Sequence, residues 1–80
     1  MSYHLTEIPR GVYGEFSKIE EEFLEAKDAI DQENPVMVLQ ELSDMLGAIE
    51  AYTAKYNITL IDLIIMKDAT KRAFESGHRV

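Results

Sequence analysis

Residues 16–44 read FSKIEEEFLEAKDAIDQENPVMVLQELSD, and this stretch decides the fold. Apolar side chains recur every three or four positions on both sides of Asn34-Pro35, a spacing typical of amphipathic helices. Asparagine is a favoured N-cap, and proline suits the first helical position because its missing N–H needs no partner there. The pattern therefore predicts two helices joined at about residues 32–34, a connection short enough to favour an antiparallel hairpin.

The same reasoning extended to the whole chain predicts an all-α fold with three main helices and no strands. We expect helices over about Val12–Asp31, Pro35–Tyr56 and Leu60–Ser76. Thr59 to Asp62 has the form of a capping box at the start of the third helix, and Gly77 is a plausible stop after it.

The remaining segments carry weaker signals. Asn57 is expected to close the second helix. Residues 1–11 contain Pro9 and Gly11 and are expected to form an extended N-terminal arm. With 80 residues, the chain is expected to be one domain spanning residues 1–80.

Composition narrows the class of protein. The chain has no cysteine, so it can form neither a disulfide nor a thiolate metal site. The net charge of −7 argues against binding duplex nucleic acid through its phosphates. The longest apolar run, Leu63–Met66, is far too short to span a membrane, and the first residues lack the pattern of a signal peptide. We expect a cytoplasmic protein with no membrane partner.

The start of the third helix predicts self-association. From Leu60 to Met66, apolar side chains lie on nearly every side of the helix. Such a helix needs cover all round, and two other helices of a short chain can hardly supply it. We expect a homodimer with two-fold symmetry, or a dimer of dimers that forms a tetramer. The alternative is that the first helix and the arm cover this surface alone.

The charge is unevenly distributed along the chain. The segment from Glu15 to Asp44 has ten acidic residues and only two lysines, whereas the segment from Lys67 to Val80 has four basic residues and two acidic ones. Acidic residues can simply solvate helix surfaces. The positions of four of these acidic residues indicate a metal site instead.

Two pairs of carboxylates flank apolar stripes. Glu22 and Glu25 lie about 60° apart around the first helix, and Glu41 and Asp44 lie about 60° apart around the second. An antiparallel hairpin allows both pairs to face one cleft. Four converging carboxylates require a compensating charge, and a sulfur-free oxygen cluster suits Mg²⁺ or Mn²⁺.

These residues also resemble a family signature. Glu21-Glu22-Phe23-Leu24-Glu25, a gap of 15 residues, and then Glu41-Leu42-Ser43-Asp44 fit the pattern E-E-x-x-E, gap, E-x-x-D. This pattern resembles that of the MazG-like, all-α nucleoside triphosphate pyrophosphohydrolases. The resemblance covers roughly Phe16 to Arg79.

The resemblance implies an enzyme for nucleotide pool cleaning or control. Its substrate would be a nucleoside triphosphate, hydrolysed to the monophosphate and pyrophosphate. Glu22, Glu25, Glu41 and Asp44 would be the Mg²⁺ ligands, with Mn²⁺ as the other candidate ion. Glu21 and Glu22 would be the catalytic carboxylates, with Glu21 orienting or deprotonating the attacking water.

The resemblance further implies that basic side chains of the third helix and of the residues after it bind the triphosphate. The candidates are Lys67, Lys71, Arg72 and Arg79. For Lys71 and Arg72 the alternative role is to complement the dipole at the helix C-terminus. The chain departs from many relatives because its third helix contains no asparagine.

Base recognition is not assigned. The chain has no tryptophan, so the available rings are those of tyrosine and phenylalanine. Phe16 and Phe23 lie on the apolar stripe and are expected to pack, whereas Tyr13 and Phe74 stay open as candidates. His4 and His78 are not at metal-ligand spacing and are expected to be surface residues.

Two other functions remain open at this stage. One is pyrophosphohydrolysis of phosphoribosyl-ATP, which stays within the same superfamily. The other is a non-catalytic helical module for dimerisation or regulation that has kept the acidic face.

Overall fold

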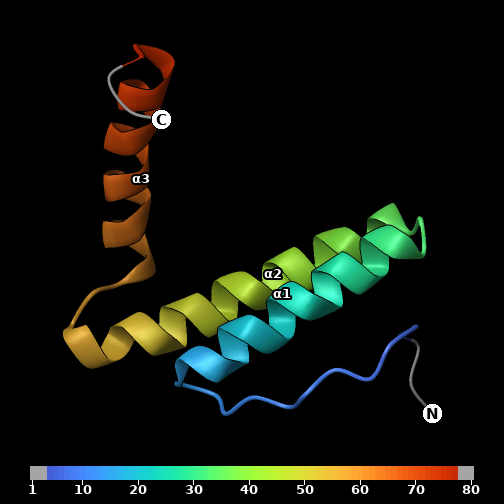
Figure 1. Cartoon of the computed structure of the whole chain (residues 1–80). Coiled ribbons are helices and arrows are strands. Elements are labelled where there is room, and N and C mark those ends of the chain that lie inside the picture. Colours follow the sequence, from blue (N-terminus) through green and yellow to red (C-terminus); the bar gives the residue numbers. More distant parts are fainter. Residues whose placement is uncertain (1–3, 78–80) are drawn as a thin grey trace.

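The computed structural model describes residues 4–77, and over this range it is all-helical. The helices are α1 (Phe16–Asp31), α2 (Pro35–Thr53) and α3 (Leu60–Glu75), and the 3-10 turn η1 (Ala54–Tyr56) extends α2. Figure 1 shows α1 and α2 as an antiparallel hairpin, with α3 standing away from one end of it. The predicted all-α class and three helices are confirmed. None of the helices in this range combines the length and the hydropathy that crossing a membrane requires.

The predicted caps are present at two helix starts. Asn34 Oδ1 accepts a hydrogen bond from the backbone N–H of Met37 at 3.1 Å, at the start of α2. Thr59 and Asp62 form a reciprocal capping box at the start of α3. Side chains that satisfy the first N–H groups of a helix set where that helix begins.

Two other boundaries differ in detail from expectation. The first helix begins at Phe16 and not at Val12, because residues 12–15 form a turn in which Gly14 has a φ of 92°. That left-handed conformation is incompatible with a continuing α-helix. The second α-helix ends at Thr53 and not at Tyr56, because residues 54–56 tighten into the 3-10 turn η1. Asn57 then adopts a φ of 60° and turns the chain toward α3, which matches its expected role in closing this helix.

The interior of the hairpin contains little hydrocarbon. Its buried apolar residues within residues 4–77 are three alanines, Ala26, Ala29 and Ala48. Two carboxylates, Glu22 and Glu41, are buried beside them at 5% and 2% exposure. Small side chains allow the two helices to approach closely, and this approach encloses acidic groups rather than large apolar ones.

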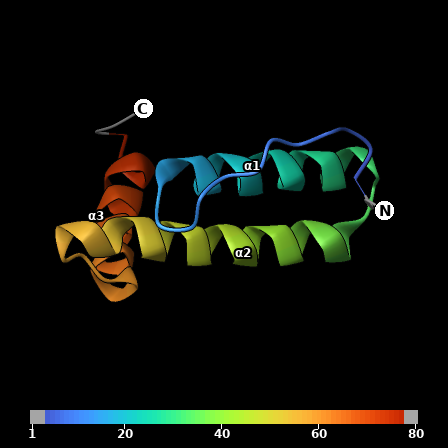
Figure 2. The same cartoon turned by 90° about the horizontal axis from the view of Figure 1, so that it is seen from below.

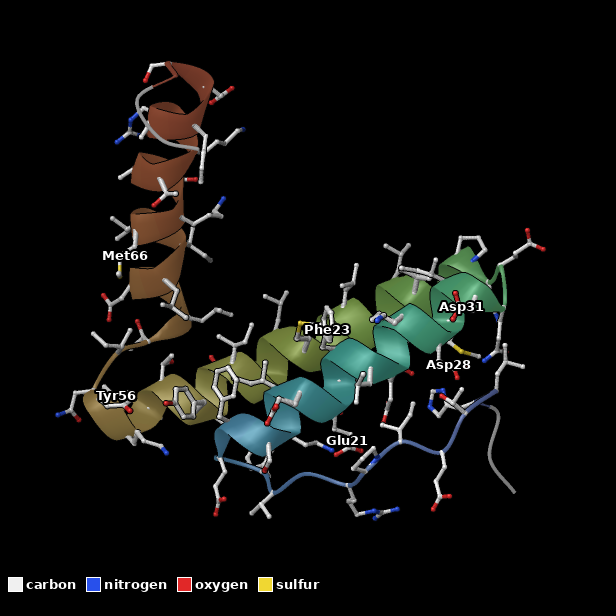
Figure 3. The ribbon with its side chains drawn as sticks, in the orientation of Figure 1. Glu21, Phe23, Asp28, Asp31, Tyr56 and Met66 are labelled. Carbon is white, nitrogen blue, oxygen red and sulfur yellow. The ribbon has the colours of Figure 1, made fainter. Side chains whose placement is uncertain are left out.

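The large apolar side chains of the hairpin lie elsewhere. Phe16 and Phe23 were expected to pack, but in the single chain they are 55% and 51% exposed, although Phe16 meets the ring of Tyr52 edge-on. Figure 3 shows Phe23 on the side of α1 opposite Glu21 and Asp28. The same exposure extends to Ile30 on α1 and to Val36, Leu39, Leu42 and Leu46 on α2.

Helix α3 is exposed along its whole length. Among the residues that the structure describes, none of those in α3 is buried, and Ile61, Ile65 and Met66 are each more than half exposed. Figures 1 and 2 show that α3 meets the end of α2 and stands clear of α1 and the arm. The alternative in which α1 and the arm cover this helix is therefore wrong.

The described part of the N-terminal arm, residues 4–11, runs along α1 (Figure 2). Hydrogen bonds latch it to Asp28. The backbone N–H groups of Leu5 and Thr6 each donate to the Asp28 carboxylate at 2.9 Å, and the Thr6 hydroxyl and Gln32 amide add further hydrogen bonds. Burial of Asp28 would raise its pKa, but these donors outweigh it and hold the pKa well below its usual range.

A second contact fixes the other end of the arm. Gly11 N–H donates to Glu21 Oε1 at 2.8 Å. A Cβ at position 11 would overlap the carbonyl of Ser17 and lie 2.6 Å from the Cα of Lys18, so only glycine fits against the start of α1. The arm is thus held across the acidic side of α1.

We expect Asp28→Asn to release the arm while leaving the helices intact. Because the folded-state pKa is depressed, the latch contributes stability above the unfolded value of 3.8 and loses it as pH falls through the folded value. Amide hydrogen exchange at Leu5 and Thr6 should accelerate in the variant at neutral pH, with unchanged helical circular dichroism. Asp31→Asn, an exposed aspartate on the same helix, is the control. Unchanged exchange at Leu5 and Thr6 in Asp28→Asn would contradict this account of the latch.

Candidate metal centre

The hairpin brings the predicted carboxylates together. Glu22 from α1 meets Glu41 and Asp44 from α2, and one carboxylate oxygen of each lies within 4.8 Å of the others. Glu21, Glu22 and Glu25 form a second such group along α1. The two acidic pairs expected to face one cleft therefore do face each other.

Burial within this cluster is unequal. Glu22 and Glu41 are buried, Glu21 and Glu25 are partly exposed, and Asp44 is exposed. The Oε2 atoms of Glu22 and Glu41 accept no hydrogen bond from any residue in the range 4–77. Leaving a buried carboxylate oxygen without a partner is costly, and a cation satisfies such an oxygen. The donor set, made only of carboxylate oxygens, fits Mg²⁺ or Mn²⁺.

Lys18 supplies part of the compensating charge. Its Nζ lies 3.1 Å from Glu21 Oε1 and 3.3 Å from Glu22 Oε1, one helical turn away. The i, i+3 and i, i+4 spacing is visible in the sequence and could have identified this contact. A single ammonium group does not balance five carboxylates.

The pKa values of the glutamates are shifted by burial and by this excess of negative charge. Burial, reinforced by the neighbouring carboxylates of Glu41 and Glu21, raises the pKa of Glu25 to about 8. Burial also raises the pKa of Glu22, with Lys18 opposing and the Asp44 and Glu41 charges reinforcing the rise. For Glu21, burial is outweighed by the Gly11 N–H and Lys18, which lower its pKa.

Two hollows lead to the cluster. One, of about 450 Å³, lies between the arm and α1 and is lined by Arg10, Glu21 and Glu25 together with residues 4–8. The other, of about 390 Å³, is lined by Tyr13, Lys18, Glu22 and Asp44 together with small residues of α2. Both volumes fall within the range of small-ligand sites. Glu21 and Glu25 line the first hollow and Glu22 and Asp44 the second, whereas Glu41 lines neither.

The arm contributes residues that sequence reasoning did not assign. His4 was expected at the surface, but its side chain is only 11% exposed, with Nε2 3.7 Å from Glu25 Oε2 and Nδ1 3.5 Å from Asp28 Oδ1. Helical periodicity carries no information on where an extended segment docks. Nothing in the sequence pattern therefore indicated that His4 and Arg10 would lie beside the carboxylates. His78 lies outside the described residues.

The basic residues of α3 do not reach this cluster in the single chain. Lys67, Lys71 and Arg72 lie on α3, which stands at the far end of the hairpin (Figure 3), and Lys67 pairs with Asp68 at 2.8 Å. Arg79 lies outside the described residues. Within the described residues, the α3 side chains and the carboxylate cluster therefore belong to separate parts of the single chain.

Tyr13 and Phe74, the two candidates for base recognition, lie in different parts of the chain. The ring of Tyr13 borders the hollow that contains Lys18 and Glu22, and it is 73% exposed. Phe74 instead borders a hollow on α3 with Lys67 and Lys71. Tyr13 is thus the ring of the two that lies beside the carboxylates of its own chain.

No protein-family model matches this chain, and it has no significant match among curated protein sequences or solved structures. The function is therefore inferred from the residue types and from their placement in the hairpin and the arm.

We expect the metal-free protein to lose stability as pH rises from about 4.5 to about 8, the unfolded and folded values for Glu25. Between these values the folded chain keeps a proton that the unfolded chain has released, so deprotonation favours unfolding. Glu25→Gln should remove most of this slope in urea unfolding measured with EDTA. Glu20→Gln, an exposed glutamate of α1, should retain it. Equal slopes in parent and Glu25→Gln would show that Glu25 does not hold the proton.

Proposed function

We propose that this chain hydrolyses a nucleoside triphosphate between its α- and β-phosphates, giving the monophosphate and pyrophosphate, with Mg²⁺ as cofactor. The observation that carries the proposal is the pair of buried carboxylates, Glu22 and Glu41, each with one oxygen that accepts no hydrogen bond from residues 4–77. The resemblance to the MazG-like pattern supplies the class of reaction, because the same carboxylates form the motif.

The cluster has the donor set that such an ion requires. Glu22, Glu25, Glu41 and Asp44 would hold Mg²⁺, and Mn²⁺ is the alternative ion for the same oxygens. When bound, a divalent ion offsets the charge of the triphosphate and lowers the pKa of a coordinated water. Burial and neighbouring carboxylates raise the pKa values of Glu22 and Glu25, and a bound cation would offset both effects by stabilising the ionised carboxylates.

The two proposed catalytic carboxylates have different properties. Glu21 is anchored by the Gly11 N–H and Lys18, and its lowered pKa keeps it ionised. An ionised, weakly basic carboxylate is suited to orient a water molecule by accepting its hydrogen bond. Glu22, with its raised pKa, is the stronger base of the two.

Phosphate binding would draw on two sources of positive charge. Within the chain, Lys18 and Arg10 each border one of the two hollows at the cluster. Lys67, Lys71 and Arg72 of α3, and Arg79 further along the chain, would contribute from a second copy. Arginine forks and lysine ammonium groups both bind phosphate oxygens.

Self-association is part of the proposal. The hairpin exposes large apolar side chains such as Phe23 and Leu39, and α3 exposes Ile61 and Ile65. Large exposed apolar surface in a small protein marks an interaction site, and a second copy with two-fold symmetry is the simplest occupant. A dimer, or a dimer of dimers, would also bring α3 of one copy within reach of the other.

We expect Glu41→Gln to lower turnover by about two orders of magnitude or more, because an amide has neither the charge nor the geometry of the carboxylate ligand. In the parent, Mg²⁺ should raise the melting temperature in a concentration-dependent way, and in the variant it should do so much less. With EDTA, the variant should be at least as stable as the parent, because it relieves like-charge repulsion.

Glu50→Gln, an exposed glutamate of the same helix, is the matched control for that comparison. Chromatography of the parent reaction should show nucleoside monophosphate and pyrophosphate as the first products. Nucleoside diphosphate as the first product, or full activity in Glu41→Gln, would refute the proposed chemistry. A parent that melts identically with EDTA and with millimolar Mg²⁺ or Mn²⁺ would refute the metal site.

We expect light scattering at micromolar concentration to give at least about twice the chain mass of 9.1 kDa. Ile65→Glu places a charge on the exposed apolar surface of α3 and should shift the protein toward the monomer. Glu75→Gln changes the charge at an exposed position of α3 that has no proposed role, and it should preserve the parent's mass. A parent that remains at 9.1 kDa would rule out the proposed assembly.

A further inference from the structure

The arm places an imidazole at the edge of the carboxylate cluster. His4 is the one histidine within residues 4–77, and its side chain is largely buried. A ring nitrogen of His4 and one carboxylate oxygen each from Glu25 and Glu41 lie within 4.8 Å of one another. One nitrogen and two oxygen donors thus converge from three segments that are distant in the sequence.

Asp28 stands behind the imidazole. Its Oδ1 lies 3.5 Å from His4 Nδ1, while Nε2 is the nitrogen nearer Glu25, at 3.7 Å. No hydrogen bond joins Asp28 to Nδ1 at this distance. A small shift of the ring that brought them together would favour the tautomer with its proton on Nδ1 and its lone pair on Nε2. Metal-binding histidines are commonly oriented in this way by a carboxylate on their second nitrogen. The backbone donors of Leu5 and Thr6 hold Asp28 in place for this role.

Glu41 gives independent evidence of a missing ligand. Only 2% of Glu41 is exposed, and no residue of the described range donates a hydrogen bond to its Oε2. Glu41 also belongs to both donor groups, the one with His4 and Glu25 and the one with Glu22 and Asp44. Glu41 is therefore the carboxylate shared by the two donor groups.

We propose that His4, Glu25 and Glu41 form a second cation site, which takes a divalent transition-metal ion such as Co²⁺ or Zn²⁺ in preference to Mg²⁺. The distinction follows from the donors, because imidazole nitrogen suits these ions whereas Mg²⁺ is bound through oxygen. This inference rests in part on the proposed function, since Glu25 and Glu41 are also assigned there to Mg²⁺. The His4 site extends that cluster on the side of the arm.

Binding at this site also ties the arm to the hairpin. His4 precedes Leu5 and Thr6, the residues latched to Asp28. An ion shared by His4, Glu25 and Glu41 links the arm to both α1 and α2. The transition-metal ion should therefore slow amide exchange at Leu5 and Thr6. An ion bound only to Glu22, Glu41 and Asp44 does not contact the arm and should not slow this exchange directly.

The test is a pair of variants titrated with two ions, using the full chain without a histidine tag. Co²⁺ and Mg²⁺ binding are measured by calorimetry, and the Co²⁺ complex also by its visible absorption. The parent should bind Co²⁺ at least about tenfold more tightly than Mg²⁺. His4→Gln should lose about tenfold or more in Co²⁺ affinity, alter the spectrum, and keep its Mg²⁺ affinity within about twofold. His78→Gln, the other histidine of the chain, should match the parent.

The variant Asp44→Asn distinguishes this inference from the proposed function. Asp44→Asn should weaken Mg²⁺ binding and leave the Co²⁺ spectrum unchanged, whereas His4→Gln should change the Co²⁺ spectrum and leave Mg²⁺ binding unchanged.

A further measurement needs no variant. It follows the ¹⁵N resonances of the His4 ring during Zn²⁺ addition, and the Nε2 resonance should shift while Nδ1 keeps its proton. The inference is overturned if His4→Gln binds Co²⁺ like the parent, if the parent prefers Mg²⁺, or if Zn²⁺ leaves the His4 ring unchanged. Failure of Mg²⁺ to support pyrophosphate release overturns the proposed function instead and leaves these readouts intact.

Discussion

Repulsion between the carboxylates inside the α1–α2 hairpin is the constraint on which the rest of the structure depends. Ala26, Ala29 and Ala48 allow the helices to approach closely, and this approach forces Glu22 against Glu41. Acidic groups so placed need positive charge, hydrogen-bond donors or protons. Each neighbouring feature of the hairpin supplies one of these: the Lys18 ammonium, the Gly11 N–H, and the raised pKa of Glu25.

The arm belongs to this electrostatic system as much as the helices do. Its two anchors are both carboxylates of α1, Glu21 at one end and Asp28 at the other. They lie two helical turns apart on the same side of α1, as Figure 3 shows, so a straight segment can engage both. The acidic side of the helix thus organises an otherwise irregular segment, and that segment in turn carries His4 and Arg10 to the cluster.

The sequence predicted the helices and the meeting of the carboxylates because both depend on local spacing. Asn34-Pro35 and the Thr59–Asp62 box determine helix starts through contacts within a few residues. Periodicity also placed Glu22 and Glu41 on facing sides of two helices. It did not show that these glutamates would be more buried than Phe16 and Phe23, because hydropathy ranks a residue by type and not by the partner it meets.

What escaped prediction depends on contacts between distant segments. The positions of His4 and Arg10 follow from hydrogen bonds between the arm and α1, over more than twenty residues in the case of Leu5 and Asp28. Extended backbone has no periodic signature that would announce such docking. The direction of α3 is set by the turn at Asn57, and its φ angle fixes an orientation that composition does not encode.

The thin alanine interior has a thermodynamic consequence. The heat capacity change of unfolding comes mainly from hydration of newly exposed apolar surface, and polar surface contributes with the opposite sign. The buried groups of this hairpin are three alanines and several carboxylates. Unfolding therefore exposes little apolar surface from these positions and a comparatively large share of polar surface. The heat capacity change of unfolding of the isolated chain is therefore small for its length, and its stability curve has correspondingly low curvature.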